Sequence, residues 1–211
     1  MDSIIESGVQ PKSAESTPRV YRENNPLVVV TGVSGSGKDR LIEEFRERSN
    51  MDVDVVNFGE ELFERLRLQL PDLSSRDEIA YSVPQNELYP IIRELVSDIR
   101  ERGPAILNTH VVYRHGGGLT ANPAVEQQVN PDAYFFVQAD AAQIVAWRRK
   151  DEFRERQQEE ERDIALHQDI ARAVTGYLAE YVNARFLVIE NSSDNIDRNW
   201  RLLEENIEAC P

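Results

Sequence analysis

From Pro26 onward, short apolar runs alternate with longer stretches in which apolar residues recur every three or four positions. The short runs are rich in Val, Ile and Phe, and they predict strands at Leu27–Thr31, Val53–Asn57, Ala105–Thr109, Tyr134–Gln138 and Phe186–Glu190. The longer stretches predict helices at Lys38–Arg48, Glu60–Leu70, Asn86–Arg102, Ala141–Val182 and Ile196–Glu208. Strands that alternate with helices are typical of βαβ units, so the pattern predicts a three-layer α/β sandwich around one parallel sheet.

Two segments depart from this alternation. The stretch Ala141–Val182 is too long for one ordinary helix, and its middle, RERQQEEERD, is almost entirely polar, so we expect an exposed lid over about residues 148–163 between two helices. Residues 1–25 are rich in Ser, Glu and Pro and show no apolar period, which predicts a flexible tail. The tail is either solvated and without function or an arm that binds a partner. The rest, residues 26–211, forms one domain.

Charge and cysteine usage exclude several classes of protein. The 211 residues include 24 Lys and Arg against 38 Asp and Glu, a formal net charge of −14 at pH 7. Such a chain repels nucleic acid and anionic membranes, which are bound through cationic contacts to phosphates, so an anionic ligand must be held locally. The single cysteine, Cys210, excludes an intrachain disulfide and a cysteine metal cluster. With no secretory signal and no apolar run long enough to span a bilayer, we expect a soluble cytoplasmic protein.

The strongest chemical signal is Gly32-Val-Ser-Gly-Ser-Gly-Lys38, between the first predicted strand and the first predicted helix. Its glycines let consecutive N–H groups point inward, and the helix N-terminus adds positive potential, which is typical of a P-loop that grips a polyphosphate. Lys38 would then reach the β- and γ-phosphates of ATP; the alternative is a Gly-rich turn with a solvated lysine. The candidate ATP-binding residues here are Gly32, Val33, Ser34, Gly35, Ser36, Gly37, Lys38, Asp39 and Arg40.

The positions beside this loop bear on a magnesium site. A P-loop places a Ser or Thr hydroxyl on Mg²⁺ directly after the lysine, whereas this chain has Asp39 and then Arg40. Asp39 either binds Mg²⁺ directly, which predicts an unusually strong Mg²⁺ dependence, or faces water while the phosphates alone hold the metal. Asn108 ends the third predicted strand, where P-loop proteins often place an acidic residue that orients the magnesium waters.

The second and third predicted strands turn polar at their carboxyl ends, the edge where open α/β sheets bind ligands. His110 is there either as a satisfied loop histidine or as a catalytic base. Arg76 lies in a predicted loop between these strands and could clamp the phosphate of an acceptor. The candidate acceptor-binding residues are Asn57, Phe58, Gly59, Arg76, Thr109 and His110.

A cluster of cations lies on and beside the predicted lid. Forked guanidinium groups on a closing lid would neutralise a transferring phosphoryl group and exclude water. Acidic residues at helical ion-pair spacing surround them, so a solvated helix is the alternative. The cluster comprises Arg148, Arg149, Lys150, Arg154, Arg156 and Arg162.

In order and spacing over residues 27–191, this chain resembles the archaeal-type adenylate kinase family, through VVVTGVSGSGK, VNFGEELFE, SSRDEI, ILNTH, residues 146–163 and LVIENSSDN. The resemblance implies a P-loop kinase fold with strand order 2-3-1-4-5 and helices on both faces. It also implies reversible phosphoryl transfer from MgATP to AMP, and frequently a homotrimer. It places Gly32, Gly35, Gly37 and Lys38 at the ATP phosphates, Asn191 near the ATP adenine, Asn57, Phe58, Gly59 and Arg76 on the monophosphate side, and Arg148, Arg154 and Arg156 in the lid.

The chain departs from that family pattern where metal and lid chemistry are carried. The family has hydroxyl residues in place of Asp39 and Arg40, and an aspartate in place of Asn108 and of Gln157. We interpret the chain as a nucleoside monophosphate kinase of the adenylate kinase type that uses Mg²⁺. The alternatives are a P-loop kinase for another small acceptor and a degenerate nucleotide-binding protein with a regulatory or scaffold role.

Overall fold

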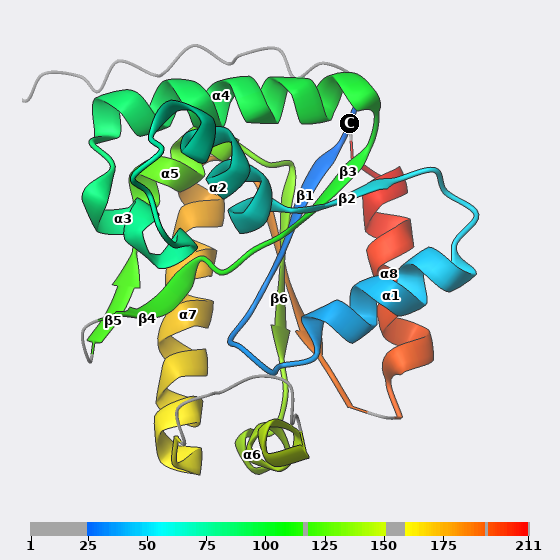
Figure 1. The fold of residues 1–211 in the computed structure, drawn as a ribbon. Helices are drawn as coiled ribbons and strands as arrows, with labels where there is room; N and C mark the ends of the chain where they lie inside the picture. Colours follow the sequence, from blue (N-terminus) through cyan, green and yellow to red (C-terminus); the bar gives the residue numbers. More distant parts are fainter. Residues whose placement is uncertain (1–24, 116–117, 151–158, 193, 211) are drawn as a thin grey trace, which may run out of the picture.

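A central sheet of five parallel strands organises the computed structural model, which describes residues 25–115, 118–150, 159–192 and 194–210 (Figure 1). The order across the sheet is β2-β3-β1-β6-β7. The strands are β1 (Leu27–Thr31), β2 (Asp54–Asn57), β3 (Ala105–Asn108), β6 (Ala133–Gln138) and β7 (Arg185–Glu190). Numbered among the predicted strands alone, this is the order 2-3-1-4-5, so the predicted P-loop kinase sheet is confirmed. The predicted tail lies outside the described residues.

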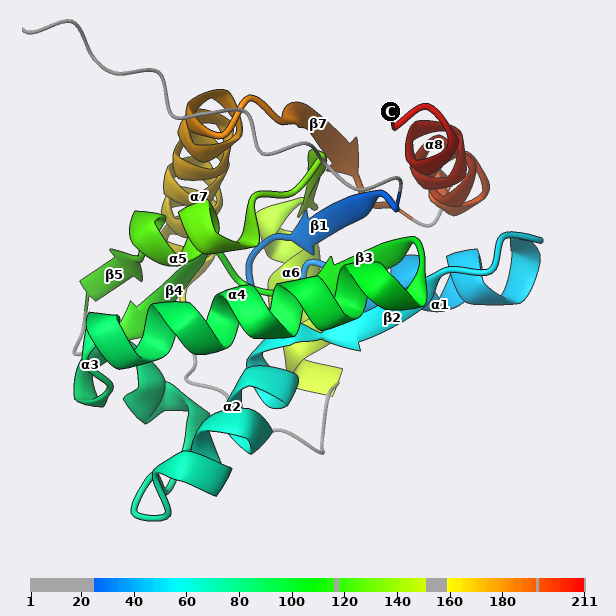
Figure 2. The ribbon, with the colours of Figure 1, turned by 90° about the horizontal axis from the view of Figure 1, so that it is seen from above.

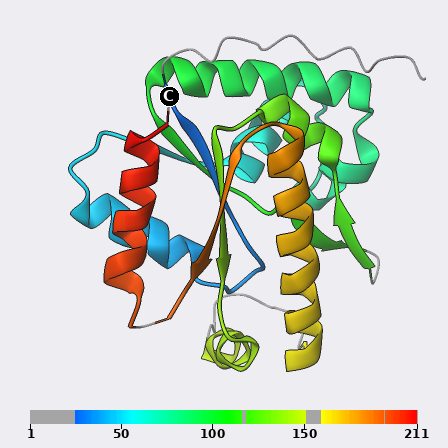
Figure 3. The ribbon, with the colours of Figure 1, turned by 180° about the vertical axis from the view of Figure 1, so that it is seen from behind.

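Alternation along the central strand β1 explains the three layers. Val28 and Val30 face one apolar core and Leu27 and Val29 face the other, and all four side chains are fully buried. The first core packs against α1 (Lys38–Arg48) and α8 (Ile196–Glu208). The second packs against α2 (Phe58–Gln69), α4 (Gln85–Arg102), α6 (Ala141–Lys150) and α7 (Glu161–Tyr181). Figures 2 and 3 show the sheet between these two groups of helices.

Several short elements were missing from the sequence prediction. The strands β4 (Val112–His115) and β5 (Gly118–Ala121) form an antiparallel hairpin outside the main sheet, and α5 (Pro123–Val129) follows it. The strand sequences VYRH and GLTA contain no run of apolar residues, which explains the omission. Arg76 is not in a loop as predicted: it begins a 3₁₀ turn (Arg76–Glu78) that leads into α3 (Ile79–Ser82).

The long stretch after β6 divides into two helices, α6 and α7, as its polar middle predicted. Residues 151–158 of the expected lid lie outside the described residues, while its two ends belong to the last turn of α6 and the start of α7. Among the described residues, no helix is both long enough and apolar enough to cross a membrane.

Candidate active site

The loop between β1 and α1 has the curled backbone that a P-loop requires. Gly37 adopts a left-handed conformation with φ of 87°, and a Cβ atom added there would overlap the side-chain nitrogen of Asn191. An added Cβ on Gly32 would overlap the carbonyl oxygen of Val137. Asn191 donates a hydrogen bond of 2.8 Å from Nδ2 to the carbonyl of Ser36 and therefore holds the loop in place. These contacts explain why the two glycines are needed.

The predicted ATP-binding residues divide by where their side chains lie. Val33 and Ser36 are fully buried, so their side chains do not face a ligand. Arg40 points into solvent beside Glu44, with 59% of its side chain exposed, and does not line the cleft described below. Asn191 is buried under the loop and supports it.

Lys38 and His110 meet at one carbonyl of the loop. Lys38 Nζ donates to the Gly32 carbonyl at 3.3 Å, and His110 Nδ1 lies 2.8 Å from the same oxygen. Because a carbonyl oxygen only accepts, Nδ1 carries the proton of this bond. The positive charge of Lys38, followed by burial, lowers the pKa of His110 from 6.5 to about 3, although the residue lines the cleft and is exposed there. So weak a base favours the interpretation of His110 as a satisfied loop histidine.

Asp39 and Asn108 contact each other across the start of α1 and the end of β3. Asn108 Nδ2 donates to Asp39 Oδ1 at 2.8 Å, and both residues line the same cleft. The two departures from the P-loop pattern beside the loop are therefore a single hydrogen-bonded pair. The pair presents oxygen atoms next to Lys38, and oxygen is the ligand that Mg²⁺ prefers.

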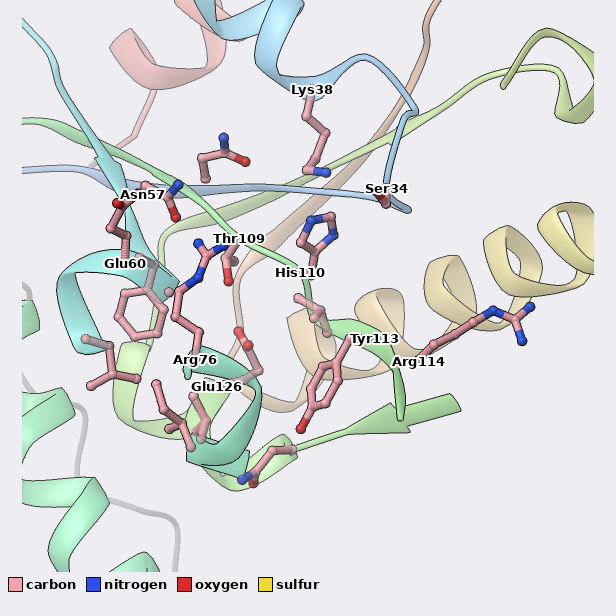
Figure 4. A pocket seen from close by; sticks show the side chains of 18 of the residues that line it. Ser34, Lys38, Asn57, Glu60, Arg76, Thr109, His110, Tyr113, Arg114 and Glu126 are labelled. Atoms are coloured by element: carbon pink, nitrogen blue, oxygen red, sulfur yellow. The ribbon is translucent and has the colours of Figure 1, made fainter. Parts of the chain in front are cut away.

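A cleft of about 600 Å³ opens at the carboxyl edge of the sheet next to the P-loop. In Figure 4, Ser34 and Lys38 lie at one side of it, Glu126 and Tyr113 lie at the opposite side, and Thr109 and His110 lie between them. All six predicted acceptor residues line this cleft: Asn57, Phe58, Gly59, Arg76, Thr109 and His110. Residues from β2, α2, the loop after β3 and the 3₁₀ turn are thus brought to one place.

The turn that carries Arg76 is held by a neighbouring carboxylate. Glu78 accepts hydrogen bonds from the backbone N–H of Ser74 at 2.9 Å and from the Ser74 hydroxyl. These bonds lower the pKa of Glu78 and keep it ionised. The turn therefore has a local reason to form, which the sequence prediction of a loop had overlooked.

Of the three arginines that the resemblance places in the lid, Arg148 alone belongs to the described residues, and it lies on the P-loop. Its Nε and Nη2 donate to the Ser34 carbonyl at 3.0 and 2.6 Å, and only 9% of its side chain is exposed. Its guanidinium also pairs with Glu159, which in turn pairs with Arg114 of β4. For Arg148 the solvated-helix alternative is wrong. Arg154 and Arg156 lie outside the described residues.

Sequence reasoning missed the residues that the hairpin and α5 bring to the cleft. These are Tyr113, Arg114, Asn122, Val125 and Glu126. Two signals could have found them: glycines between Val112 and Leu119 mark a hairpin, and Asn122-Pro123 marks a helix start.

Glu126 is the least expected member of this group. Its carboxyl is buried, with 6% of the residue exposed, and Oε2 accepts a hydrogen bond of 2.9 Å from Tyr134 Oη. Burial raises the pKa of Glu126 from 4.5 to about 7, and the bond from Tyr134 opposes part of that rise. Burial and the charge of Glu126 raise the pKa of Tyr134.

Comparisons of sequence find relatives that cover most of the chain. The AAA domain family matches residues 31–165. The adenylate kinase of Thermococcus kodakarensis is 31% identical over 172 residues, which cover 80% of this chain and 87% of that protein. The adenylate kinase of Pyrococcus horikoshii is 30% identical over 173 residues, with the same coverage of 80% and 87%. The adenylate kinase of Methanothermobacter thermautotrophicus is 28% identical over 176 residues, covering 81% and 93%.

Solved structures with low sequence identity share the fold. A shikimate kinase from Bacteroides thetaiotaomicron aligns with a TM-score of 0.52 at 16% identity, covering 87% of this chain and 98% of that one. A Thermus thermophilus protein aligns with a TM-score of 0.51 at 15% identity, covering 88% and 98%. At these identities the likeness concerns the fold alone.

Proposed function

This chain belongs to the archaeal-type adenylate kinase family, and we propose that it is a cytoplasmic adenylate kinase. The reaction moves the γ-phosphoryl group of ATP to AMP and forms two molecules of ADP. The bond between the γ-phosphorus and the bridging oxygen breaks, and a phosphate oxygen of AMP forms the new bond. Relatives at 31% and 30% identity that carry this name support the proposal.

One cleft holds the P-loop lysine together with all six candidate acceptor residues, and this observation carries the proposal. Phosphoryl transfer needs little covalent work from the protein, because positioning and charge stabilisation supply most of the rate. A donor held by the P-loop and an acceptor held beside it in the same cavity meet that need.

On the donor side, the loop N–H groups and Lys38 hold the β- and γ-phosphates. Lys38 already lies over the loop, where its ammonium group would meet them. Arg148, fixed on the Ser34 carbonyl, brings a second permanent positive charge to the same place. We assign Arg154 and Arg156 to the lid over the transferring group.

On the acceptor side, Arg76 binds the phosphate of AMP as a forked donor. In Figure 4 its guanidinium points toward the strand ends, near Asn57 and Thr109. Asn57, Phe58, Gly59, Thr109 and His110 form the wall around it. His110 also ties this wall to the P-loop through the Gly32 carbonyl, which keeps donor and acceptor sites in register.

The residues beside the loop fit a magnesium ion, because Asp39 and Asn108 bring oxygen atoms of the kind that Mg²⁺ binds. We propose that Asp39 and Asn108 hold Mg²⁺ together with the phosphates. When bound, the ion neutralises the charge of the β- and γ-phosphates. Asn108 keeps the Asp39 carboxylate aimed at the ion through its amide.

We also propose that the chain forms a homo-oligomer. Apolar side chains are exposed on one helix and on the edge strand next to it, which fits a surface covered by another copy. They are Leu166, Tyr177 and Tyr181 on α7 and Phe186 and Val188 on β7. Analytical ultracentrifugation tests this: a trimer mass is expected, and a monomer at all concentrations contradicts it.

Rates of ADP formation from ATP with AMP, GMP, CMP or UMP test the proposed function. We expect AMP to be the best acceptor and Lys38→Ala to lower its rate by roughly 100-fold or more, since it removes a charge aimed at the transferring group. Arg46→Ala is the matched control, because Arg46 is exposed on the same helix.

Two results would contradict the proposal in different ways. A different monophosphate as best acceptor would keep the P-loop kinase chemistry but replace AMP. Nucleotide binding without transfer to any acceptor would favour the regulatory or scaffold alternative.

A further inference from the structure

The cleft changes character along its length. At the P-loop side it presents Ser34, Gly35, Lys38 and Asp39, which suit phosphates. Farther along, five apolar side chains from four helices line it beside polar residues such as Arg76 and Glu126: Phe58, Leu62, Ile79, Leu88 and Val125. These helices, α2, α3, α4 and α5, gather at one end of the sheet in Figure 1. A ligand with an anionic end and a flat apolar ring matches this gradient.

Glu126 is a buried carboxyl in the wall of this cleft, on the side opposite Lys38 in Figure 4. A carboxyl group has two oxygens, and the bond from Tyr134 occupies Oε2. No step of the proposed phosphoryl transfer uses the group. Taking a carboxyl out of water costs free energy unless its hydrogen-bonding capacity is met, so a site that retains it needs a partner for the remaining oxygen.

We propose that Glu126 reads the base of the acceptor nucleotide by accepting a hydrogen bond from the exocyclic amino group of adenine. The inference rests on the proposed function, since it concerns the base of the proposed acceptor. With the phosphate of AMP held by Arg76 toward the P-loop side, the base falls on the apolar side of the cleft, where Glu126 lies. The ring packs between the apolar side chains, and Glu126 supplies the direction-dependent contact that such a surface lacks.

Tyr134 is the positioning residue for this contact. It is fully buried in β6, it does not line the cleft, and its hydroxyl holds Oε2 at 2.9 Å. The bond fixes the rotation of the carboxyl, so Oε1 remains directed to the ligand. Asn122, which lines the same cleft one turn before Glu126, offers an amide as a second polar group to the base edge.

Equilibrium binding of two ligands by calorimetry tests the proposal. The probes are AMP and purine riboside 5′-monophosphate, which lacks only the 6-amino group. In the full chain we expect the analogue to bind about tenfold more weakly than AMP, because it leaves the buried carboxyl without its donor. Glu126→Leu should bind both ligands equally, and Glu126→Gln, which keeps an acceptor oxygen, should retain the preference.

The matched control is Glu94→Leu, which removes a carboxyl from the exposed side of α4 and should keep the wild-type ratio of affinities. Equal affinities of the unaltered protein for the two ligands would overturn the proposal, even if Glu126→Leu failed to fold. An unchanged ratio of the affinities for AMP and the analogue in Glu126→Leu would also overturn it. That result is expected if Glu126 only forms a structural hydrogen bond with Tyr134. Binding is measured without turnover, so a protein that discriminates the two ligands but transfers no phosphoryl group would support this inference while refuting the proposed function.

Discussion

At the start of α1, Asp39 stands where a P-loop has a hydroxyl, and its hydrogen-bond partner Asn108 stands where a carboxylate is expected. Considered singly, each substitution weakens a magnesium site. Considered as a pair, they keep one negative charge and several oxygen ligands beside Lys38, with the carboxylate moved from the end of β3 to the helix. The Mg²⁺ site that we propose here therefore keeps its negative charge.

This exchange can be reversed by mutation. We expect Asp39→Ser to raise the Mg²⁺ concentration for half-maximal ADP formation by roughly tenfold, because the carboxylate is lost. Adding Asn108→Asp in the same chain should return this Mg²⁺ concentration toward the wild-type value. Calorimetric titration of ATP with and without Mg²⁺ provides a readout besides turnover. An unchanged Mg²⁺ response in Asp39→Ser would show that the phosphates alone hold the ion.

At the scale of elements, the P-loop is fixed by parts of the chain that are remote in sequence. Asn191, after β7, holds the Ser36 carbonyl, and Arg148, at the end of α6, holds the Ser34 carbonyl. Arg148 also pairs with Glu159, which pairs with Arg114 of the β4–β5 hairpin. Through these contacts the P-loop, the end of α6 and one wall of the cleft form a connected unit.

Breaking the contact between α6 and the loop should affect catalysis more than folding. We expect Arg148→Ala to lower kcat roughly 10- to 100-fold, since a positive charge beside the phosphates is lost. Arg148→Lys should recover little, because an ammonium group cannot reproduce the two-pronged contact with Ser34. Arg172→Ala on α7, which removes an exposed arginine, is the control. Equal loss of activity in both variants would argue against a role at the loop.

The elements that the sequence predicted correctly share a physical property: each carries a periodic apolar signal within its own residues. The five strands of the sheet and the helices α1, α2, α4, α6, α7 and α8 on its faces bury a continuous stripe or run. The hairpin and α5 are short and were not predicted. Glu126 lies on α5 and was therefore missed as well. The bonds Asp39–Asn108 and Arg148–Ser34 join residues 69 and 114 positions apart, so only the fold brings them together. The six candidate acceptor residues line one cleft, and strand ends of one parallel sheet meet at one edge, which explains this for all of them but Arg76.

The whole molecule carries a formal charge of −14, although its proposed substrates are anions. Lys38, Arg76 and Arg148 concentrate positive charge at the site, while the acidic groups lie mostly on the outer surface. Self-repulsion of such a surface opposes the compact state at low ionic strength.

Salt should therefore stabilise this protein. Between about 0.1 M and 1 M salt the screening length falls from about 10 Å to about 3 Å, which weakens repulsion between surface carboxylates. We expect Tm, measured by calorimetry, to rise by several degrees over this range of sodium chloride. A flat or falling Tm would indicate that ion pairs such as Arg48–Asp197 outweigh the repulsion.

The central claim is that one cleft places the terminal phosphoryl group of ATP against AMP. Incubating the protein with Mg²⁺, AMP and ATP labelled in the γ-phosphate, and locating the label among the products, tests this claim directly. We expect the label to appear in the β-position of ADP formed from AMP, at a rate that falls when Lys38 is replaced by alanine. Label that remains in ATP, or that appears only in inorganic phosphate, would contradict it.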